Sequence, residues 1–138
     1  MEQNKNIESG FQVNNMILAE SVFSRINNVQ FSPDASNDLQ INTEVSVNGN
    51  SIVVAEVVDL VQKYKDIEQF KFHVRMIGIF ESVGESEIKD LNHFGCVNGA
   101  AIIFPYIREH ISNLSLKAGL TPILLAPMNF TNQSIKGK

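Results

Sequence analysis

The stretch LQINTEVSVNGNSIVVAEVVDL, residues 39–60, decides the fold. Every second residue from Leu39 to Val47 is apolar or threonine, which is the period of a strand with one solvated face. Asn48-Gly49-Asn50 follows, and these residue types tolerate positive φ, so we expect a hairpin turn. The second half has spacing that would also allow a helix, but valine and isoleucine favour strands. The stretch therefore predicts a β-hairpin.

Further strands are expected on both sides of this hairpin. Residues 69–80 alternate polar side chains with Phe70, Phe72, Val74, Met76 and Phe80. Gly78 in that run predicts a bulge or a close backbone approach. Residues 11–22 carry apolar side chains on both strand faces, which predicts a strand partly buried on both sides. Residues 1–10 are polar, and we expect a flexible N-terminus.

A helix is expected in the C-terminal half of the chain. From about Ile102 to Ala118, apolar residues recur at steps of three and four. Pro105 would suit the first turn of this helix, and Gly119 would close it. Strands followed by a helix, without β-α-β alternation, indicate an α+β fold with the helix on one sheet face. At 138 residues, we expect a single domain over residues 11–138.

Composition and charge exclude several function classes. The net charge is −4 and the basic residues are scattered, so nucleic acid is not expected as a partner. No apolar run approaches the length of a membrane span, and residues 1–10 lack the apolar core of a signal peptide. The single Cys96 allows neither an intrachain disulfide nor a multi-thiolate zinc site. A cytoplasmic protein is the expectation.

The sequence contains no recognisable catalytic or cofactor motif. Phosphate-binding glycine loops, HExxH, CxxC and GxSxG are all missing. Cys96 is expected to be a small buried side chain. We therefore expect no catalytic residue, no metal and no cofactor. Two alternatives stay open: a hotdog-type thioesterase with Glu81 or Glu109 as base, and a structural oligomerisation module.

Apolar residues also occur where loops are expected. Ile26, Val29 and Phe31 lie among asparagines and a proline, and Met128 and Phe130 lie near the C-terminus. Such residues either pack over the core or in an oligomer interface, or they line an exposed groove that binds apolar ligands or peptides.

The C-terminal half resembles the signature region of the SecB family of export chaperones. The residues FPYIRE (104–109) and PILLAPMNF (122–130) match the family's LFPYARE and PxLLLAPVNF stretches. Gly78-Ile79-Phe80 matches the family's GIF, and Phe11-Gln12-Val13 matches the start of its first strand. The resemblance implies a four-stranded antiparallel sheet with a long helix on one face.

The resemblance also implies a function and a set of site residues. SecB-like proteins are ATP-independent holdases, assembled as dimers or dimers of dimers, that hold unfolded preproteins for the SecA motor. Some members instead protect the antitoxin of a toxin–antitoxin pair, which is a dedicated client. The implied client groove places these residues on its walls: Val22, Phe23, Ile26, Val29, Phe31, Met128 and Phe130.

The implied SecA-docking positions differ from the family pattern. Glu20 keeps an acidic residue on the first strand, but a second acidic position there is Ser24. Lys71 and His73 stand where leucine and glutamate are usual. We therefore expect weakened SecA docking and treat Glu20, Lys71 and His73 as the partner-docking positions.

Overall fold

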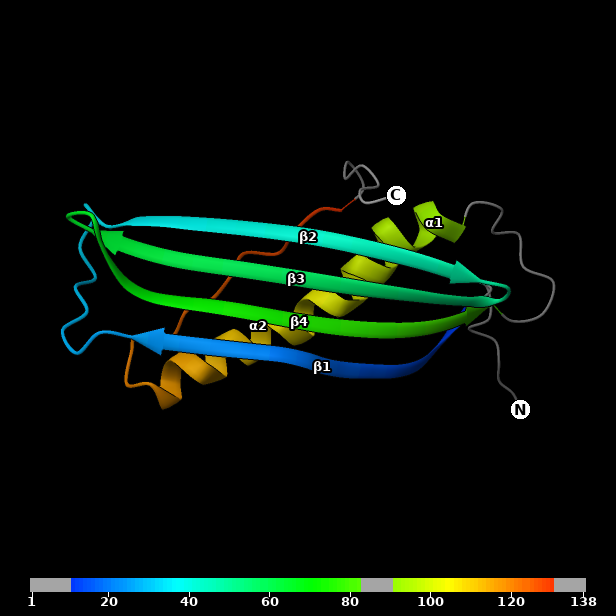
Figure 1. Cartoon of the computed structure of the whole chain (residues 1–138), viewed down its shortest axis with the longest axis horizontal. Coiled ribbons are helices and arrows are strands. Elements are labelled where there is room, and N and C mark those ends of the chain that lie inside the picture. The colour runs from blue at the N-terminus through cyan, green and yellow to red at the C-terminus, as the bar shows by residue number, and fades with distance from the viewer. Residues whose placement is uncertain (1–10, 83–90, 131–138) are drawn as a thin grey trace.

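The computed structural model describes residues 11–82 and 91–130, and it has the α+β architecture that the sequence predicts (Figure 1). Four antiparallel strands form one sheet in the order β1-β4-β3-β2. Their bounds are β1 Phe11–Arg25, β2 Ser36–Asn48, β3 Ser51–Tyr64 and β4 Ile67–Ser82. The expected flexible segment, residues 1–10, lies outside the described residues.

Two tight turns join the three consecutive strands. The β2–β3 turn is at Gly49-Asn50, as predicted, and Gly49 has a φ of 61°. The β3–β4 turn is at Lys65-Asp66, and both residues have positive φ, 53° and 64°. Two positive φ values are the signature of a type I′ turn, which matches the twist of the flanking strands. Residues 26–35 then connect β1 to β2 across the end of the sheet (Figure 1).

β1 is an edge strand with two irregularities in its register, between Val13 and Asn15 and between Leu18 and Glu20. Val22 pairs with His73 of β4, and Phe23 pairs with Phe72. Because successive residues of a strand face opposite sides of the sheet, these two pairs lie on different faces. Phe72 is buried beneath the helix, whereas Val22 is exposed on the other face. The expectation of burial on both sides of β1 is therefore wrong, because no element of the described chain covers its outer face.

The helix begins earlier than its apolar period indicated. A continuous helical path runs through α1 (Leu91–Phe94), a π-helical stretch η2 (Gly95–Gly99) and α2 (Ala100–Lys117). Pro105 consequently lies inside α2 and not in a first turn. A proline cannot donate to the carbonyl four residues earlier, and here that carbonyl belongs to the exposed Ala101, where water can replace the bond.

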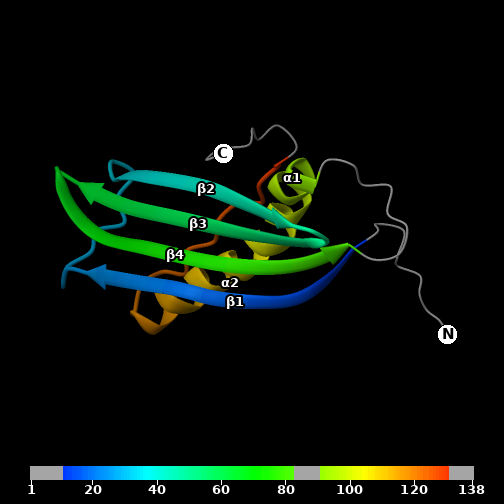
Figure 2. The same cartoon turned by 45° about the vertical axis from the view of Figure 1, so that its right-hand side comes forward.

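Glycines allow the helix to approach the sheet closely. A Cβ on Gly95 would lie 2.8 Å from Val45 Cγ1 and 3.1 Å from Val54 Cγ2. Gly78 on β4 is a close approach of the same kind, as predicted, because a Cβ there would lie 3.0 Å from Ile103 Cδ1. The helix thus crosses one face of the sheet diagonally, from β2 towards β1 (Figures 1 and 2).

The end of α2 is fixed by a glycine, as predicted. Gly119 has a φ of 76°, its N–H donates to the Leu116 carbonyl, and Leu120 N–H donates to the Ser115 carbonyl. This pair of bonds is a Schellman motif. Residues 121–130, called here the return segment, then run back along α2 on the same side of the sheet (Figure 2).

The core lies between the sheet and the helix. It is formed by the inner-face residues of β3 and β4 and the buried face of α2, which include Ile52, Val54, Val58, Phe72, Phe80, Ile103, Ile107 and Ile111. One carboxylate, Glu56, is also fully buried in this layer. No helix or strand within residues 11–82 and 91–130 covers the outer face of the sheet.

Candidate binding groove

An apolar groove lies where the helix-side face of the sheet meets the return segment. Its volume is about 260 Å³. Leu39, Leu60 and Phe70 come from three adjacent strands and form its floor. The return segment forms one wall with Ile123, Leu124 and Leu125, and Asn37 and Gln62 contribute polar groups. An apolar lining with a few polar groups is the usual composition of a binding site.

A row of aromatic rings continues this groove towards β1. The Phe31 ring lies 6.1 Å from that of Phe70, Phe70 lies 5.7 Å from Phe72, and Phe72 lies 4.7 Å from Phe23, between centroids. Phe70 and Phe72 are buried, whereas Phe31 is 49% exposed. Aromatic rings offer a large contact area that can stack with other side chains. The row therefore links the groove floor to the exposed ring of Phe31 in the loop 26–35 and to Phe23 on β1.

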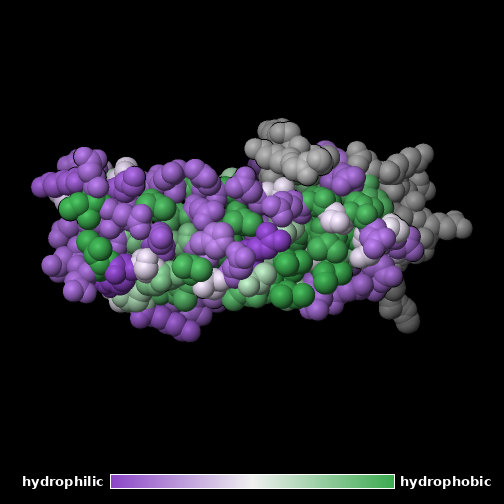
Figure 3. Space-filling view, viewed as in Figure 1, coloured by the Kyte–Doolittle hydropathy of each residue, from purple (hydrophilic) through white to green (hydrophobic). Residues whose placement is uncertain are grey.

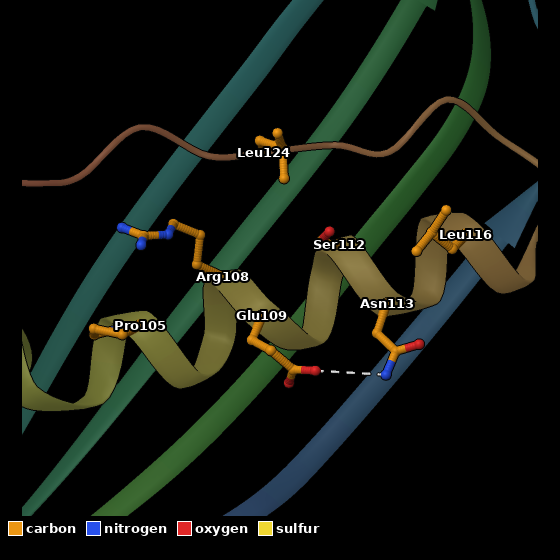
Figure 4. Close-up of a pocket in the computed structure, with 7 residues that line it drawn as sticks. All are labelled: Pro105, Arg108, Glu109, Ser112, Asn113, Leu116 and Leu124. Atoms are coloured by element: carbon orange, nitrogen blue, oxygen red, sulfur yellow. Dashed lines mark hydrogen bonds between the residues drawn. The ribbon is translucent and has the colours of Figure 1, made fainter.

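A second, more polar hollow of about 480 Å³ lies on the far flank of the return segment, against α2. In Figure 4, Arg108 and Ser112 reach from α2 towards Leu124, while Glu109 and Asn113 lie on the other side of the helix. Leu124 contributes to both hollows and is 77% exposed. The return segment thus separates an apolar groove from a polar one.

None of the residues predicted for the client site lines this groove itself, although Phe31 and Phe23 belong to the aromatic row that adjoins its floor. Ile26 and Phe31 are exposed on the loop, Val29 is half-buried beside the core, and Met128 is exposed on the return segment. Phe23 is half-buried on the helix side of β1, in the aromatic row. The structure thus brings together residues from the first strand, the loop and the floor of the sheet.

Two predicted residues lie elsewhere. Val22 points to the outer face of the sheet, because neighbouring residues of a strand face opposite sides. Phe130 is buried, with its ring 5.8 Å from that of Phe104, so it anchors the return segment to α2. Neither side chain reaches the groove surface of the described protomer.

Sequence reasoning missed the floor residues Leu39, Leu60 and Phe70. Each belongs to a strand pattern that predicts core packing, and Leu60 and Phe70 are in fact buried, so the alternation alone does not show that these residues line a groove. One feature of the sequence could have indicated the groove: the predicted strands in residues 39–80 are longer than the predicted helix, so the helix cannot cover the whole apolar face of the sheet.

The outer face of the sheet carries the positions expected to dock a partner. His73 Nε2 lies 2.6 Å from Glu20 Oε1, and His73 Nδ1 lies 2.7 Å from Asp59 Oδ1. Carboxylates only accept hydrogen bonds, so both ring nitrogens donate when the imidazole is protonated. Hydrogen bonds to Glu20 and then to Asp59 raise the pKa of His73 above its ordinary value. Glu20 is thus engaged within the protein.

The other charges on this face are partly paired as well. Arg75 Nη1 donates to Glu44 Oε1 at 3.4 Å, and Lys71 is exposed. Beyond the charged region, towards the β2–β3 turn, the outer face carries apolar side chains: Val53, Ala55, Ile77 and Ile79. Figure 3 shows this hydrophobic half beside a more hydrophilic one. The face is therefore mixed in charge and partly apolar.

Glu56 and Cys96 are two buried titratable groups of the helix–sheet layer. Both Glu56 carboxyl oxygens are buried without a hydrogen-bond partner among the residues that the structure describes, and desolvation raises the pKa of Glu56 to about 8. Burial, and secondarily the charge of Glu56, raises the pKa of the Cys96 thiol. Cys96 is buried, as predicted. A thiol held protonated in this way is a poor nucleophile.

The two carboxylates proposed for the thioesterase alternative have surface positions. Glu81 Oε1 accepts a hydrogen bond from Asn14 Nδ2 at 3.1 Å, and Glu109 Oε2 accepts one from Asn113 Nδ2 at 3.5 Å. Glu81 does not line any of the hollows described above, and Glu109 lines the polar one. Among residues 11–82 and 91–130, no group of three His, Cys, Asp or Glu side chains is arranged to hold a metal ion.

Comparison with known proteins identifies relatives over most of the chain. Protein-export protein SecB of Aromatoleum aromaticum is 34% identical over 97 residues, which are 67% of this chain and 59% of that protein. This match spans less than two thirds of the Aromatoleum protein. Protein-export protein SecB 1 of Francisella tularensis is 26% identical over 135 residues, 93% of this chain and 89% of that protein. No helix in the described part of the chain has the length and apolarity needed to cross a membrane.

A solved structure shares the fold. The SecB-like chaperone Rv1957 of Mycobacterium tuberculosis, solved with a ChAD peptide from the Rv1956 HigA1 antitoxin, superposes with a TM-score of 0.75. The two chains are 16% identical, and the match covers 91% of this chain and 98% of the other. The model of the family described as preprotein translocase subunit SecB matches residues 4–133. The chain therefore belongs to the SecB family of protein-export chaperones.

Proposed function

We propose that the protein is an ATP-independent cytoplasmic holdase that binds extended apolar segments of unfolded polypeptides in the groove on its helix side and catalyses no reaction. The observation that carries this proposal is the apolar groove floored by Leu39, Leu60 and Phe70 and continued by the exposed ring of Phe31. An extended segment exposes alternating apolar side chains, which such a surface can cover. We assign residues 11–138 to one SecB-like domain.

The energetics require more than one groove per client. Burying one large apolar side chain contributes roughly 1.5–3 kcal/mol, whereas association costs an estimated 4–15 kcal/mol. A few anchors in a groove of about 260 Å³ therefore bind one segment weakly. A long client that occupies the grooves of several protomers gains from effective concentration. We accordingly propose a homo-oligomer, a dimer or a dimer of dimers, as the working form.

The export relatives favour unfolded preproteins as clients. Delivery to SecA would use the outer face, where the Glu20 carboxylate is hydrogen-bonded to His73 and Lys71 adds a positive charge. Because Glu20 is paired with His73, the outer face offers SecA less unpaired negative charge than a face with several free carboxylates would. The SecB-like neighbour solved with an antitoxin peptide favours the second candidate, a dedicated client such as an antitoxin.

Suppression of aggregation tests the holdase activity. A reduced, slowly folding client is diluted from denaturant with increasing amounts of the protein, and light scattering is followed. We expect scattering to fall in proportion to the chaperone, and Leu39→Ser to require about tenfold more protein because an apolar anchor is lost. Ile17→Ser is the matched control, since Ile17 is 38% exposed on the outer face and Leu39 is 39% exposed in the groove. Unchanged scattering at several-fold molar excess of the wild type would refute the proposal.

Identification of bound polypeptides separates the two client classes. The protein is isolated from its native host under mild conditions, and the co-purifying chains are identified by mass spectrometry. A broad set of secretory precursors supports export, whereas one small protein present in stoichiometric amount supports a dedicated client.

A further inference from the structure

The two segments that flank the groove are both fastened to the last turn of α2, residues 115–118. The loop 26–35 is on one side, and the return segment is on the other. Neither belongs to the sheet or to a helix. The loop is tied to the sheet at two points, where Ile26 N–H donates to the Gln69 carbonyl at 2.9 Å and Gln62 Nε2 donates to the Gln30 carbonyl at 3.3 Å. Each segment also has a hydrogen-bonded link to this one turn, through Arg25 for the loop and through Ser115 for the return segment.

Arg25 holds the loop. It is the last residue of β1, and its guanidinium donates to three backbone carbonyls. Nε donates to Ile26 O at 2.8 Å and Nη2 donates to Asn27 O at 2.7 Å, both in the loop. Nη1 donates to Ala118 O at the C-terminal end of α2. A planar guanidinium can satisfy three acceptors in fixed directions, which an ammonium cannot.

Ser115 holds the return segment from the same turn. Its side chain is fully buried, and Oγ donates to Ser112 O at 2.7 Å while accepting from Ile123 N at 3.0 Å. Ile123 and the next two residues form the wall of the groove. The separation of loop and wall is thus set through a chain of bonds from Ile26 and Asn27, through Arg25, to Ala118 and Ser115.

We infer that Arg25 is a positioning residue for client binding: it fixes the loop that carries Ile26, Val29 and Phe31 against the end of α2. This inference rests on the proposed holdase function. A loop already held in place loses less conformational freedom when a client binds, so preorganisation raises affinity. Arg25 itself is exposed and lies outside the apolar core, so its replacement leaves that packing intact.

The first experiment compares Arg25→Met with the wild type in two measurements. Hydrogen exchange of the amides in residues 26–31 should become faster in the variant, and the affinity for an unfolded, fluorescently labelled client should fall by about tenfold. Arg75→Met is the matched control, since Arg75 pairs with Glu44 on the opposite sheet face and should change neither measurement. Equal client affinity in Arg25→Met and wild type would overturn the inference. So would a lower affinity with unchanged loop exchange, because Arg25 would then contact the client directly.

Two further variants guard against a folding defect. Arg25→Lys keeps the charge and can reach some of the carbonyls, so both measurements should lie between wild type and Arg25→Met. Arg25→Ala should regain client affinity when millimolar guanidinium, but not sodium, chloride is added. Absence of both intermediate behaviour and rescue contradicts a positioning role. If the wild type binds no unfolded client, the holdase function fails, and the exchange measurement still decides whether Arg25 fixes the loop.

Discussion

Replacing Glu56 by glutamine should remove a large pH dependence of stability. Glu56 lies on β3 between Thr43 and Met76 of the neighbouring strands, fully buried beneath the helix layer. Its two carboxyl oxygens have no hydrogen-bond partner in the described part of the chain, so the charged form is strongly disfavoured. Glutamine has nearly the same shape and cannot ionise, so it isolates the effect of the charge.

The magnitude follows from the shift in pKa. Desolvation raises the pKa of Glu56 from 4.5 to about 8 in the folded protein. Above pH 4.5 the unfolded chain releases this proton while the folded protein keeps it, so rising pH favours unfolding until the folded group also ionises. At about 1.4 kcal/mol per pKa unit, the wild type should lose about 3.5 kcal/mol between pH 5 and pH 8 that Glu56→Gln retains.

The assay is urea unfolding of both proteins at several pH values and one protein concentration, since oligomers respond to concentration. The difference in unfolding free energy should grow steadily from pH 5 to pH 8 and level off above it. Parallel pH profiles for wild type and variant would refute the reasoning, because Glu56 would then have a polar partner or access to water.

Three further predictions concern the turn, the outer face and the helix–sheet contact. Replacing Lys65-Asp66 by Asn-Gly should stabilise the protein by about 1 kcal/mol, because both turn residues have positive φ; a thermal unfolding midpoint that is unchanged or lower would contradict this. The imidazole of His73 should have a pKa above its ordinary value of 6.5 in an NMR titration. Its bonds to Glu20 and Asp59 should stabilise the protein at low pH, and this stabilisation should be lost as pH rises through the raised pKa. A lower pKa of His73 in the wild type than in Glu20→Gln would exclude the ion pair. Gly95→Ala should destabilise the protein by about 1–3 kcal/mol, because the new methyl group would clash with Val45 and Val54. A thermal unfolding midpoint equal to that of the wild type would contradict this and show that the helix can move away from the sheet.

The sequence predicts the sheet well because its strands are regular and local. The alternation over residues 39–47 and 69–80 and the turn at Gly49 each follow from short-range rules, and the structure agrees with all three. The Lys65-Asp66 turn was less evident, since a type I′ turn usually contains asparagine or glycine. The early start of the helix was missed because Gly95 and Gly99 weaken the apolar period, although they are the residues that let the helix contact the sheet.

The residues expected at the client site and the lining of the groove are different sets that meet at the aromatic row. The apolar residues of the loop were recognised because they are unusual in a loop, and Phe31 is exposed beside the groove. Val22 lies on the outer face and Phe130 packs against Phe104, and a resemblance shows neither the face of an edge strand that a residue occupies nor the ring that a tail residue contacts. The hydrogen bond from Arg25 to Ala118 joins residues 93 positions apart, and no local pattern predicts such a contact.

The most direct test of the holdase account is to locate a bound client by site-specific photo-crosslinking. A photoreactive phenylalanine derivative is placed at residue 31 or at residue 22, which are equally exposed at 49% but lie beside the groove and on the outer face, respectively. The account predicts crosslinks to an unfolded client from residue 31 and none above background from residue 22. Crosslinks from residue 22 alone, or from both with equal yield, would contradict binding in the groove.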